Sequence, residues 1–134
     1  MANFKQDFMR YMDAQGVKYT DTAEFRVRVA YTGENLKSIP VYVTFDSDGD
    51  NLVQFHCWEI ANFKDKLSDG IFACNFQNAK YRWVKFYIDD DGDVVCSTDA
   101  YLGADCGSEC LSLVHRVVNI TDQAYPVFMK ALYS

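Results

Sequence analysis

Two stretches of this sequence repeat one plan, in which an alternating strand pattern is followed by an acidic Asp-Gly-Asp cluster and a second strand pattern. The first is "VYVTFDSDGDNLV" at residues 41–53, and the second is "VKFYIDDDGDVV" at residues 84–95. A period of two predicts strands with one buried face. Asp, Gly and Asn tolerate the backbone dihedrals of tight turns. The sequence therefore predicts two antiparallel hairpins.

The other segments give the remaining elements. "EFRVRVAYTG" and "LVQFHCW" also alternate, and residues 2–15 show helical spacing that ends at Gly16. Helical spacing over residues 63–74 predicts a second helix, with Asn62 as its N-cap and Gly70 as a weak point.

The C-terminal segment is helical from Leu111 onward. Asp122 is a candidate N-cap, and Pro126 fits the first turn of a final helix, so the tail is either two helices or one kinked helix. The element order is α-β-β-β-α-β-β-α(α). It predicts one α+β domain over residues 1–134, with an antiparallel sheet of about five strands and helices packed on one face.

Charge and composition exclude several classes of protein. The formal net charge of -6 disfavours nucleic acid and anionic membranes, which require a positive field. No segment approaches the roughly 18 apolar residues of a membrane span, and acidic residues interrupt the N-terminal segment where a signal peptide would be apolar. The 5 cysteines are an odd number within apolar patterns, which indicates reduced thiols and a cytoplasmic protein.

The acidic clusters do not meet the requirements of a calcium loop of the EF-hand type. Such a loop needs Gly at its sixth position and a bidentate Glu at its twelfth. The first cluster has Asn51 and Cys57 at those positions, and the second has Val94 and Ala100. Two solvated hairpin turns are the simpler interpretation.

Other catalytic or metal-binding chemistry has little support. Cys106 and Cys110 are four residues apart and could share a helix face, but a zinc site usually needs four ligands. The chain has 2 histidines and lacks the phosphate-binding and nucleophile motifs, so we expect no enzyme and no cofactor. A metal- or ligand-responsive protein that uses the Asp turns or Cys106/Cys110 remains the alternative.

The predicted outward face of the sheet is unusually aromatic and basic. Such a mixture is typical of protein-contact surfaces. Cross-strand stabilisation of the sheet, or cover by a helix, would explain it equally well. The candidate partner-binding residues are Arg26, Arg28, Tyr42, His56, Trp58, Trp83 and Tyr87.

The run "CNFQNAKYRWVKFYIDDDGDVVCSTDAYL", the later "AYPVFMKAL" and the earlier "VTFDSDGDNLVQF" resemble the YbjN family of small bacterial proteins. The resemblance implies a fold similar to type III secretion chaperones, which are often dimeric. It also implies a regulator of sensory transduction without a known enzymatic activity or cofactor. We therefore expect a non-enzymatic regulator or chaperone-like adaptor that binds a protein partner, with a homodimer as a further expectation.

Overall fold

The computed structural model describes residues 3–134 and confirms the α+β class. It contains three helices and six strands, one strand more than predicted. In chain order they are α1 (Phe4–Gln15), β1 (Thr20–Ala23), β2 (Arg26–Tyr31), β3 (Ile39–Phe45), β4 (Leu52–Cys57), α2 (Leu67–Lys80), β5 (Lys85–Ile88), β6 (Val94–Tyr101) and α3 (Cys106–Tyr133).

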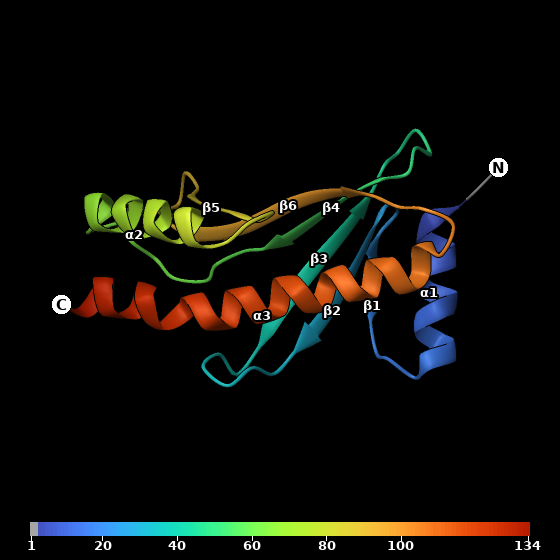
Figure 1. Cartoon of the computed structure of the whole chain (residues 1–134), viewed down its shortest axis with the longest axis horizontal. Coiled ribbons are helices and arrows are strands. Elements are labelled where there is room, and N and C mark those ends of the chain that lie inside the picture. The colour runs from blue at the N-terminus through green and yellow to red at the C-terminus, as the bar shows by residue number, and fades with distance from the viewer. Residues whose placement is uncertain (1–2) are drawn as a thin grey trace.

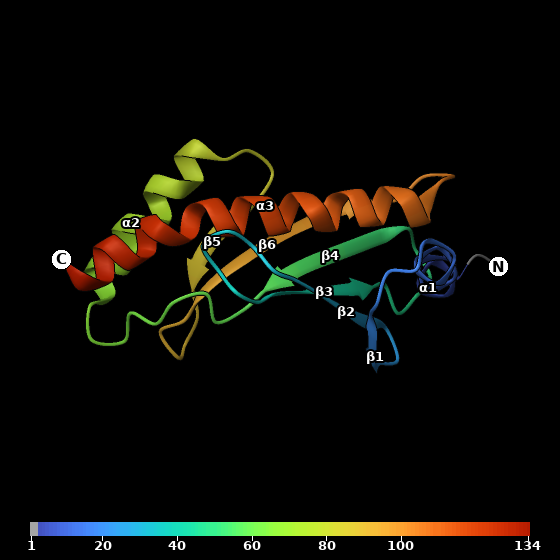
Figure 2. The same cartoon turned by 90° about the horizontal axis from the view of Figure 1, so that it is seen from below.

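The strands form one antiparallel sheet in the order β1-β2-β3-β4-β6-β5. The long helix α3 runs along one face of this sheet, α1 lies at one end and α2 at the other (Figure 1). Seen from below, the opposite face has none of the helices of residues 3–134 on it (Figure 2). The prediction that the helices share one face is confirmed.

The alternation of the strands separates a core face from an outer face. On β2 and β3, Val27, Val29, Val41 and Val43 are buried under the helices, while their neighbours in sequence are partly exposed. Phe8 of α1 packs against the end of this layer, with its ring centroid 5.9 Å from that of Phe45. Apolar burial on one face therefore fixes the register, because a shift of one residue would expose the whole set.

Both acidic clusters form the predicted hairpin turns, β3–β4 and β5–β6. Asp46 accepts hydrogen bonds from the backbone N–H groups of Asp48 and Asp50, and Asp89 accepts the equivalent pair from Asp91 and Asp93. Gly49 and Gly92 each have a φ of 84°, a left-handed conformation that favours glycine. The two sequence repeats are thus one turn structure used twice.

The first helix agrees with its prediction over the described residues, and Ala2 of the predicted range lies outside them. Its N-cap is Asn3, and Gly16 ends it with a φ of 69°. Strand β1 was missed because its four residues, Thr20–Ala23, are all exposed and show no apolar alternation.

The predicted start of the second helix was wrong. Asn62 does not cap α2, because its side-chain amide donates to Asp91 and Asp93 in the β5–β6 turn. Phe63 is fully buried in the loop before the helix, so its apolar character reflects the core and not helical spacing. The helix begins at Leu67 and continues to Lys80.

The C-terminal tail is a single helix, so the two-helix alternative and the Asp122 cap were wrong. Pro126 lies inside α3 and Asp122 is buried in its middle. The Asp122 carboxylate accepts hydrogen bonds from the backbone of Glu34, Asn35 and Leu36, in the loop between β2 and β3. Asp122 therefore ties this loop to α3 and does not start a helix.

Candidate functional site

The outer sheet face is the surface opposite the helices. Strand register places its side chains in rows that cross the sheet. One row runs through Arg28, Tyr42, His56, Ser97 and Lys85, which are successive partners on β2, β3, β4, β6 and β5. Five of the seven predicted residues are within β2–β5 on this face, and Trp58 directly follows β4.

Trp58 follows β4, and its ring packs against residues of β2, β3 and β4 on the outer sheet face. Its ring stacks on His56 with centroids 4.9 Å apart and an interplanar angle of 13°. The ring of Tyr42 lies 4.8 Å away, and the guanidinium of Arg26 lies over the indole at 5.2 Å from its centroid. The structure thus brings together Arg26, Tyr42, His56 and Trp58, which we call the outer-face cluster.

His56 is desolvated by this arrangement. Its Nδ1 atom is buried and has no hydrogen-bond partner. Burial lowers the pKa of His56 below its ordinary value, and the positive charge of Arg26 lowers it further. Asp99 opposes this effect in part, and Lys85 adds the smallest lowering. The imidazole is therefore neutral at physiological pH and contributes to the cluster as a flat, weakly polar ring.

The positive charges on the outer sheet face are not paired with carboxylates. Arg26 donates to the hydroxyl of Thr44 at 3.1 Å, and Lys85 lies 5.8 Å from the ring centroid of Tyr87. Within residues 3–134, the ion pairs are elsewhere and join Lys5 to Asp21, Arg10 to Asp7 and Lys66 to Asp69. The face consequently carries free positive charge on an acidic protein.

The predicted position of Trp83 was wrong. Trp83 has a φ of 78°, which interrupts the alternation just before β5. Its ring packs 6.0 Å from that of Phe55, a fully buried residue of the core face, and its indole N–H donates to the carbonyl of Asp99. Trp83 is therefore a packing residue at the sheet margin, whereas Tyr87 remains on the outer face and is 37% exposed.

The second candidate group, the cysteines, shows no sign of reactivity. All 5 are buried and free. Burial raises the pKa of Cys57 and of Cys96 to about 12, and that of Cys74 to about 11. Burial also raises the pKa of Cys106 and Cys110. Neutral, buried thiols are poor nucleophiles and poor metal ligands.

The β5–β6 turn is the acidic cluster that comes nearest to a metal site. Ligand atoms of Asp89, Asp91 and Asp93 all lie within 4.8 Å of one another. However, one Asp89 oxygen already accepts the two turn N–H groups, and an Asp93 oxygen accepts from Asn62. These contacts account for the cluster as a turn.

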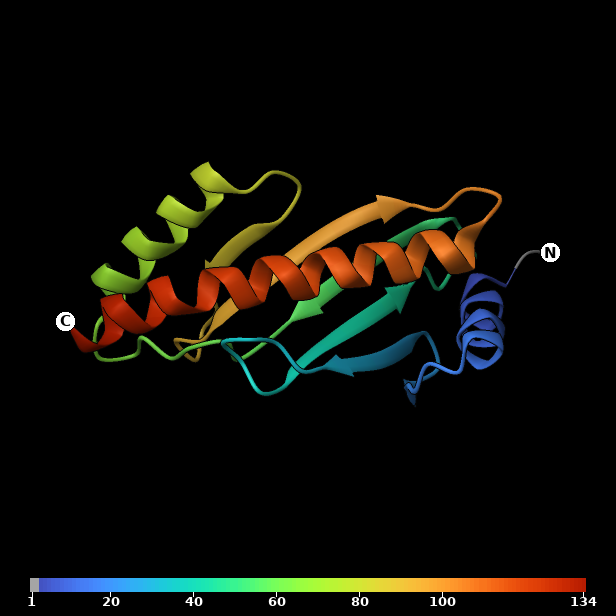
Figure 3. The ribbon, with the colours of Figure 1, turned by 60° about the horizontal axis from the view of Figure 1, so that its bottom comes forward.

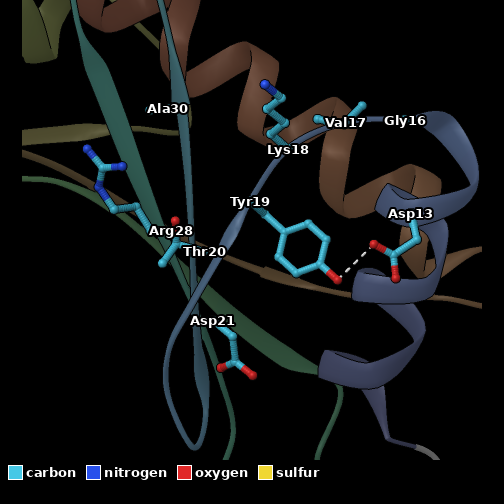
Figure 4. A pocket seen from close by; sticks show the side chains of 9 residues that line it. All are labelled: Asp13, Gly16, Val17, Lys18, Tyr19, Thr20, Asp21, Arg28 and Ala30. Carbon is cyan, nitrogen blue, oxygen red and sulfur yellow. Dashed lines mark hydrogen bonds between the residues drawn. The ribbon is translucent and has the colours of Figure 1, made fainter.

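A hollow between the end of α1 and β1 is the remaining concave feature of interest (Figure 4). Tyr19 donates from its hydroxyl to Asp13 across this hollow at 2.9 Å. The guanidinium of Arg28 points away from that pair (Figure 4). The hollow contains no group of nucleophile, base and orienting residue, so it does not suggest an active site.

Comparison with known proteins identifies the family. The model of the YbjN family, described as "Putative bacterial sensory transduction regulator", matches residues 8–129. The chain belongs to the YbjN family. No curated protein sequence matches it.

Two solved structures are similar to this YbjN-family chain. One is a chain of the heterodimeric ExoU-SpcU complex from the type III secretion system of Pseudomonas aeruginosa. Its TM-score is 0.59 at 14% identity, with 92% of this chain and 96% of that chain covered. The other is a chain of the Yersinia pestis type III secretion chaperone SycH in complex with a fragment of YscM2, with a TM-score of 0.48, 13% identity, and coverage of 88% and 99%. The first likeness confirms the expected chaperone-like fold.

No helix among residues 3–134 of this YbjN-family chain has the length and apolar character needed to traverse a bilayer.

Sequence reasoning missed an apolar surface on α2. Leu67, Ile71, Phe72 and Phe76 are exposed by 50%, 55%, 75% and 58%. Phe72 and Phe76 are four residues apart, which places them on one side of the helix, away from the buried Cys74 and Gln77. The sequence could have predicted this surface, because neither Phe72 nor Phe76 fits the helical spacing of the residues expected to face the core.

Proposed function

We propose that this YbjN-family protein is a non-enzymatic, cytoplasmic regulator or chaperone-like adaptor that binds a protein partner through its outer sheet face. The observation that supports this most directly is the outer-face cluster, centred on a face that no helix covers. Trp, Tyr and Arg are the residues most often responsible for binding energy at protein interfaces. A half-buried, preorganised group of them suits such a role.

The structural neighbour supports the same role. The ExoU-SpcU structure is a heterodimeric complex, so this fold has been observed bound to another protein. At 14% identity the likeness concerns the fold, and the choice of face for this chain rests on its own residues.

The double variant Trp58→Ala/Tyr42→Ala tests the proposed function. Partner capture from lysate of the native host, compared by quantitative mass spectrometry, should lose the proteins that the wild type retains. Tyr133→Ala is the matched control, since Tyr133 is 81% exposed at the end of α3, the helix on the opposite side of the sheet (Figure 2). Equal capture by a folded double variant would show that the outer sheet face is not the partner-binding surface.

A homodimer through α2 is a second part of the proposal. α2 lies along the margin of the molecule beside the C-terminal half of α3 (Figure 3). Its exposed stripe begins with Asp69, continues through Phe72 and Phe76, and ends with Lys80. In an antiparallel pair of such helices, Phe72 meets Phe76 of the second copy, and Asp69 approaches Lys80 at each end. This self-complementary pattern suits a twofold interface.

Light scattering coupled to size-exclusion chromatography tests the dimer. Phe72→Glu should give a monomer at concentrations where the wild type is dimeric. Asp69→Lys should weaken the dimer by placing like charges together, and the further change Lys80→Asp should restore it. A wild-type monomer at high concentration would contradict the proposed interface.

The metal-responsive alternative depends on a different observation, the proximity of the Asp89, Asp91 and Asp93 carboxylates. A divalent cation held there would contact the β5–β6 turn, at the end of the sheet that also supports α2. Calcium titration distinguishes this alternative from the adaptor.

A further inference from the structure

The outer sheet face has positive charge at its two sides and aromatic rings between them. Arg28 on β2 and Lys85 on β5 belong to the same row, separated by Tyr42, His56 and Ser97. Neighbouring strands are about 4.8 Å apart, so four steps place the two residues about 19 Å apart across the sheet. Neither has a carboxylate partner among the ion pairs of the described chain.

Nearby acidic groups leave these charges available. Asp21 lies near Arg28 in Figure 4, but its carboxylate is held by the ammonium of Lys5 at 2.6 Å. Asp99 is an exposed carboxylate on this face and lies opposite Gln54, one row away from Lys85. The local charge of the row is therefore positive.

We propose that the partner presents an extended acidic segment, with two carboxylates six residues apart and apolar side chains between them. This inference rests on the proposed function. An extended chain rises about 3.3 Å per residue, so six residues span about 20 Å, which matches the separation of Arg28 and Lys85. In such a chain, residues i, i+2, i+4 and i+6 share one side. The outer two then meet Arg28 and Lys85. The inner two lie over the middle of the row, where the rings of Tyr42 and His56 pack against Trp58.

A carboxylate ligand fits this face better than a phosphate backbone. An arginine guanidinium can form two parallel hydrogen bonds with a carboxylate or with a phosphate, so the charge around the face decides between the two ligands. A nucleic acid would bring a continuous line of negative charge onto a protein of net charge -6, with Asp99 on the face and the Asp46–Asp50 turn at its edge. Aromatic rings would stack bases, so single-stranded nucleic acid is the competing ligand that must be measured.

Three fluorescein-labelled peptides of related composition test the spacing by fluorescence anisotropy at low salt. All three peptides are amidated at the C-terminus, so that glutamate supplies the peptide carboxylates. ESLSLSE places the two carboxylates six residues apart, ESLSESL places them four apart, and QSLSLSQ removes them. ESLSESL can still form one of the two charge pairs and QSLSLSQ can form neither. A partly exposed pair contributes up to about 1 kcal/mol, so we expect ESLSLSE to bind roughly two- to fivefold more tightly than ESLSESL, and to exceed QSLSLSQ by a larger factor. Added salt should reduce this preference.

Variants assign the preference to the two cations. Arg28→Ala and Lys85→Ala should each abolish the difference between ESLSLSE and ESLSESL. Lys130→Ala, which removes an exposed charge from the last turn of α3, should leave it unchanged. If Lys130→Ala also loses the preference for ESLSLSE, the preference reflects the net charge of the protein and the inference is overturned.

The remaining outcomes separate this inference from the proposed function. If all three peptides bind equally and Trp58→Ala/Tyr42→Ala weakens them all, the face binds peptides and the acidic spacing is wrong. If no peptide binds, the inference is overturned, while the capture experiment still decides the proposed function. Tighter binding of a labelled oligothymidine than of ESLSLSE would also overturn it.

Discussion

The side-chain amide of Asn35 donates a hydrogen bond to the backbone carbonyl of Asp122 at 3.1 Å. In an α-helix that carbonyl would accept from the N–H of residue 126, four positions later. Residue 126 is proline and has no N–H. Asn35, in the loop between β2 and β3, therefore replaces the hydrogen bond that Pro126 removes from the middle of α3.

A double-mutant cycle should reveal this compensation. Asn35→Ala leaves the Asp122 carbonyl without its donor, and we expect it to lower the free energy of unfolding by about 1 kcal/mol. In a Pro126→Ala background the helix supplies its own N–H, so the same change should cost less than half as much. Urea unfolding measures both costs. Equal costs in the two backgrounds would contradict the coupling, and Asn119→Ala is an exposed control on the same helix.

The Asp122 carboxylate makes a second, independent connection to the same loop. It accepts from the backbone N–H groups of Glu34 at 3.0 Å and of Asn35 and Leu36 at 2.9 Å. Burial raises the pKa of Asp122, but the three hydrogen bonds outweigh burial and hold the pKa below its ordinary value. The charged form is therefore favoured in the folded protein.

Replacing Asp122 should destabilise the protein and change its acid response. Asp122→Ala leaves three backbone donors unsatisfied, with an expected loss of roughly 1–3 kcal/mol. Because the folded pKa is depressed, the stabilisation is present above the unfolded value near pH 4 and is lost as the pH falls below it. Thermal unfolding from pH 7 to pH 3 should show a smaller acid-induced decrease for Asp122→Asn than for the wild type. Parallel curves would exclude this role.

These contacts explain which parts of the fold the sequence could predict. The hairpins were predictable because alternation and turn residues are local signals, and both Asp-Gly-Asp turns form as expected. Asp122 and Pro126 looked like a helix start because the compensating residue, Asn35, lies 87 residues away in the sequence. The position of Trp83 was missed because a positive φ at a bulky residue reflects its tertiary packing.

Replacing Gly70 by alanine is a test in which packing and helix propensity have opposite effects on stability. Alanine normally stabilises a helix interior relative to glycine by up to about 1 kcal/mol. A Cβ at Gly70 would lie 2.6 Å from side-chain atoms of both Phe63 and Ile88. We therefore expect Gly70→Ala to destabilise the protein by about 1–3 kcal/mol, the usual cost of overpacking. Ser68→Ala, at an exposed position of α2, is the control for propensity alone; a stabilised Gly70→Ala protein would show that α2 is loosely packed.

His56 should make stability depend on pH in the neutral range. Its folded pKa is lowered, first by burial and then by Arg26, so the unfolded chain binds the proton more readily. The contribution of His56 to the free energy of unfolding is therefore fully present above the pKa of the unfolded chain, near 6.5. It decreases as the pH falls below that value. Melting temperatures between pH 8 and pH 5 should decrease less for His56→Gln than for the wild type. Arg26→Gln should also flatten the dependence, and an unchanged slope in both variants would assign the effect to other groups.

Calcium should not bind tightly to either acidic turn. The Asp46 and Asp89 side chains already accept N–H groups of their own turns, and the positions of a bidentate glutamate are occupied by Cys57 and Ala100. An oxygen site without that ligand is expected to have, at best, millimolar affinity. Calorimetric titration of the wild type against Asp91→Asn should give no saturable difference at micromolar calcium. A micromolar transition that disappears in Asp91→Asn would instead support the metal-responsive alternative. The Asp91 side chain makes no hydrogen bond in the turn, so its replacement by asparagine would remove little besides a possible metal ligand.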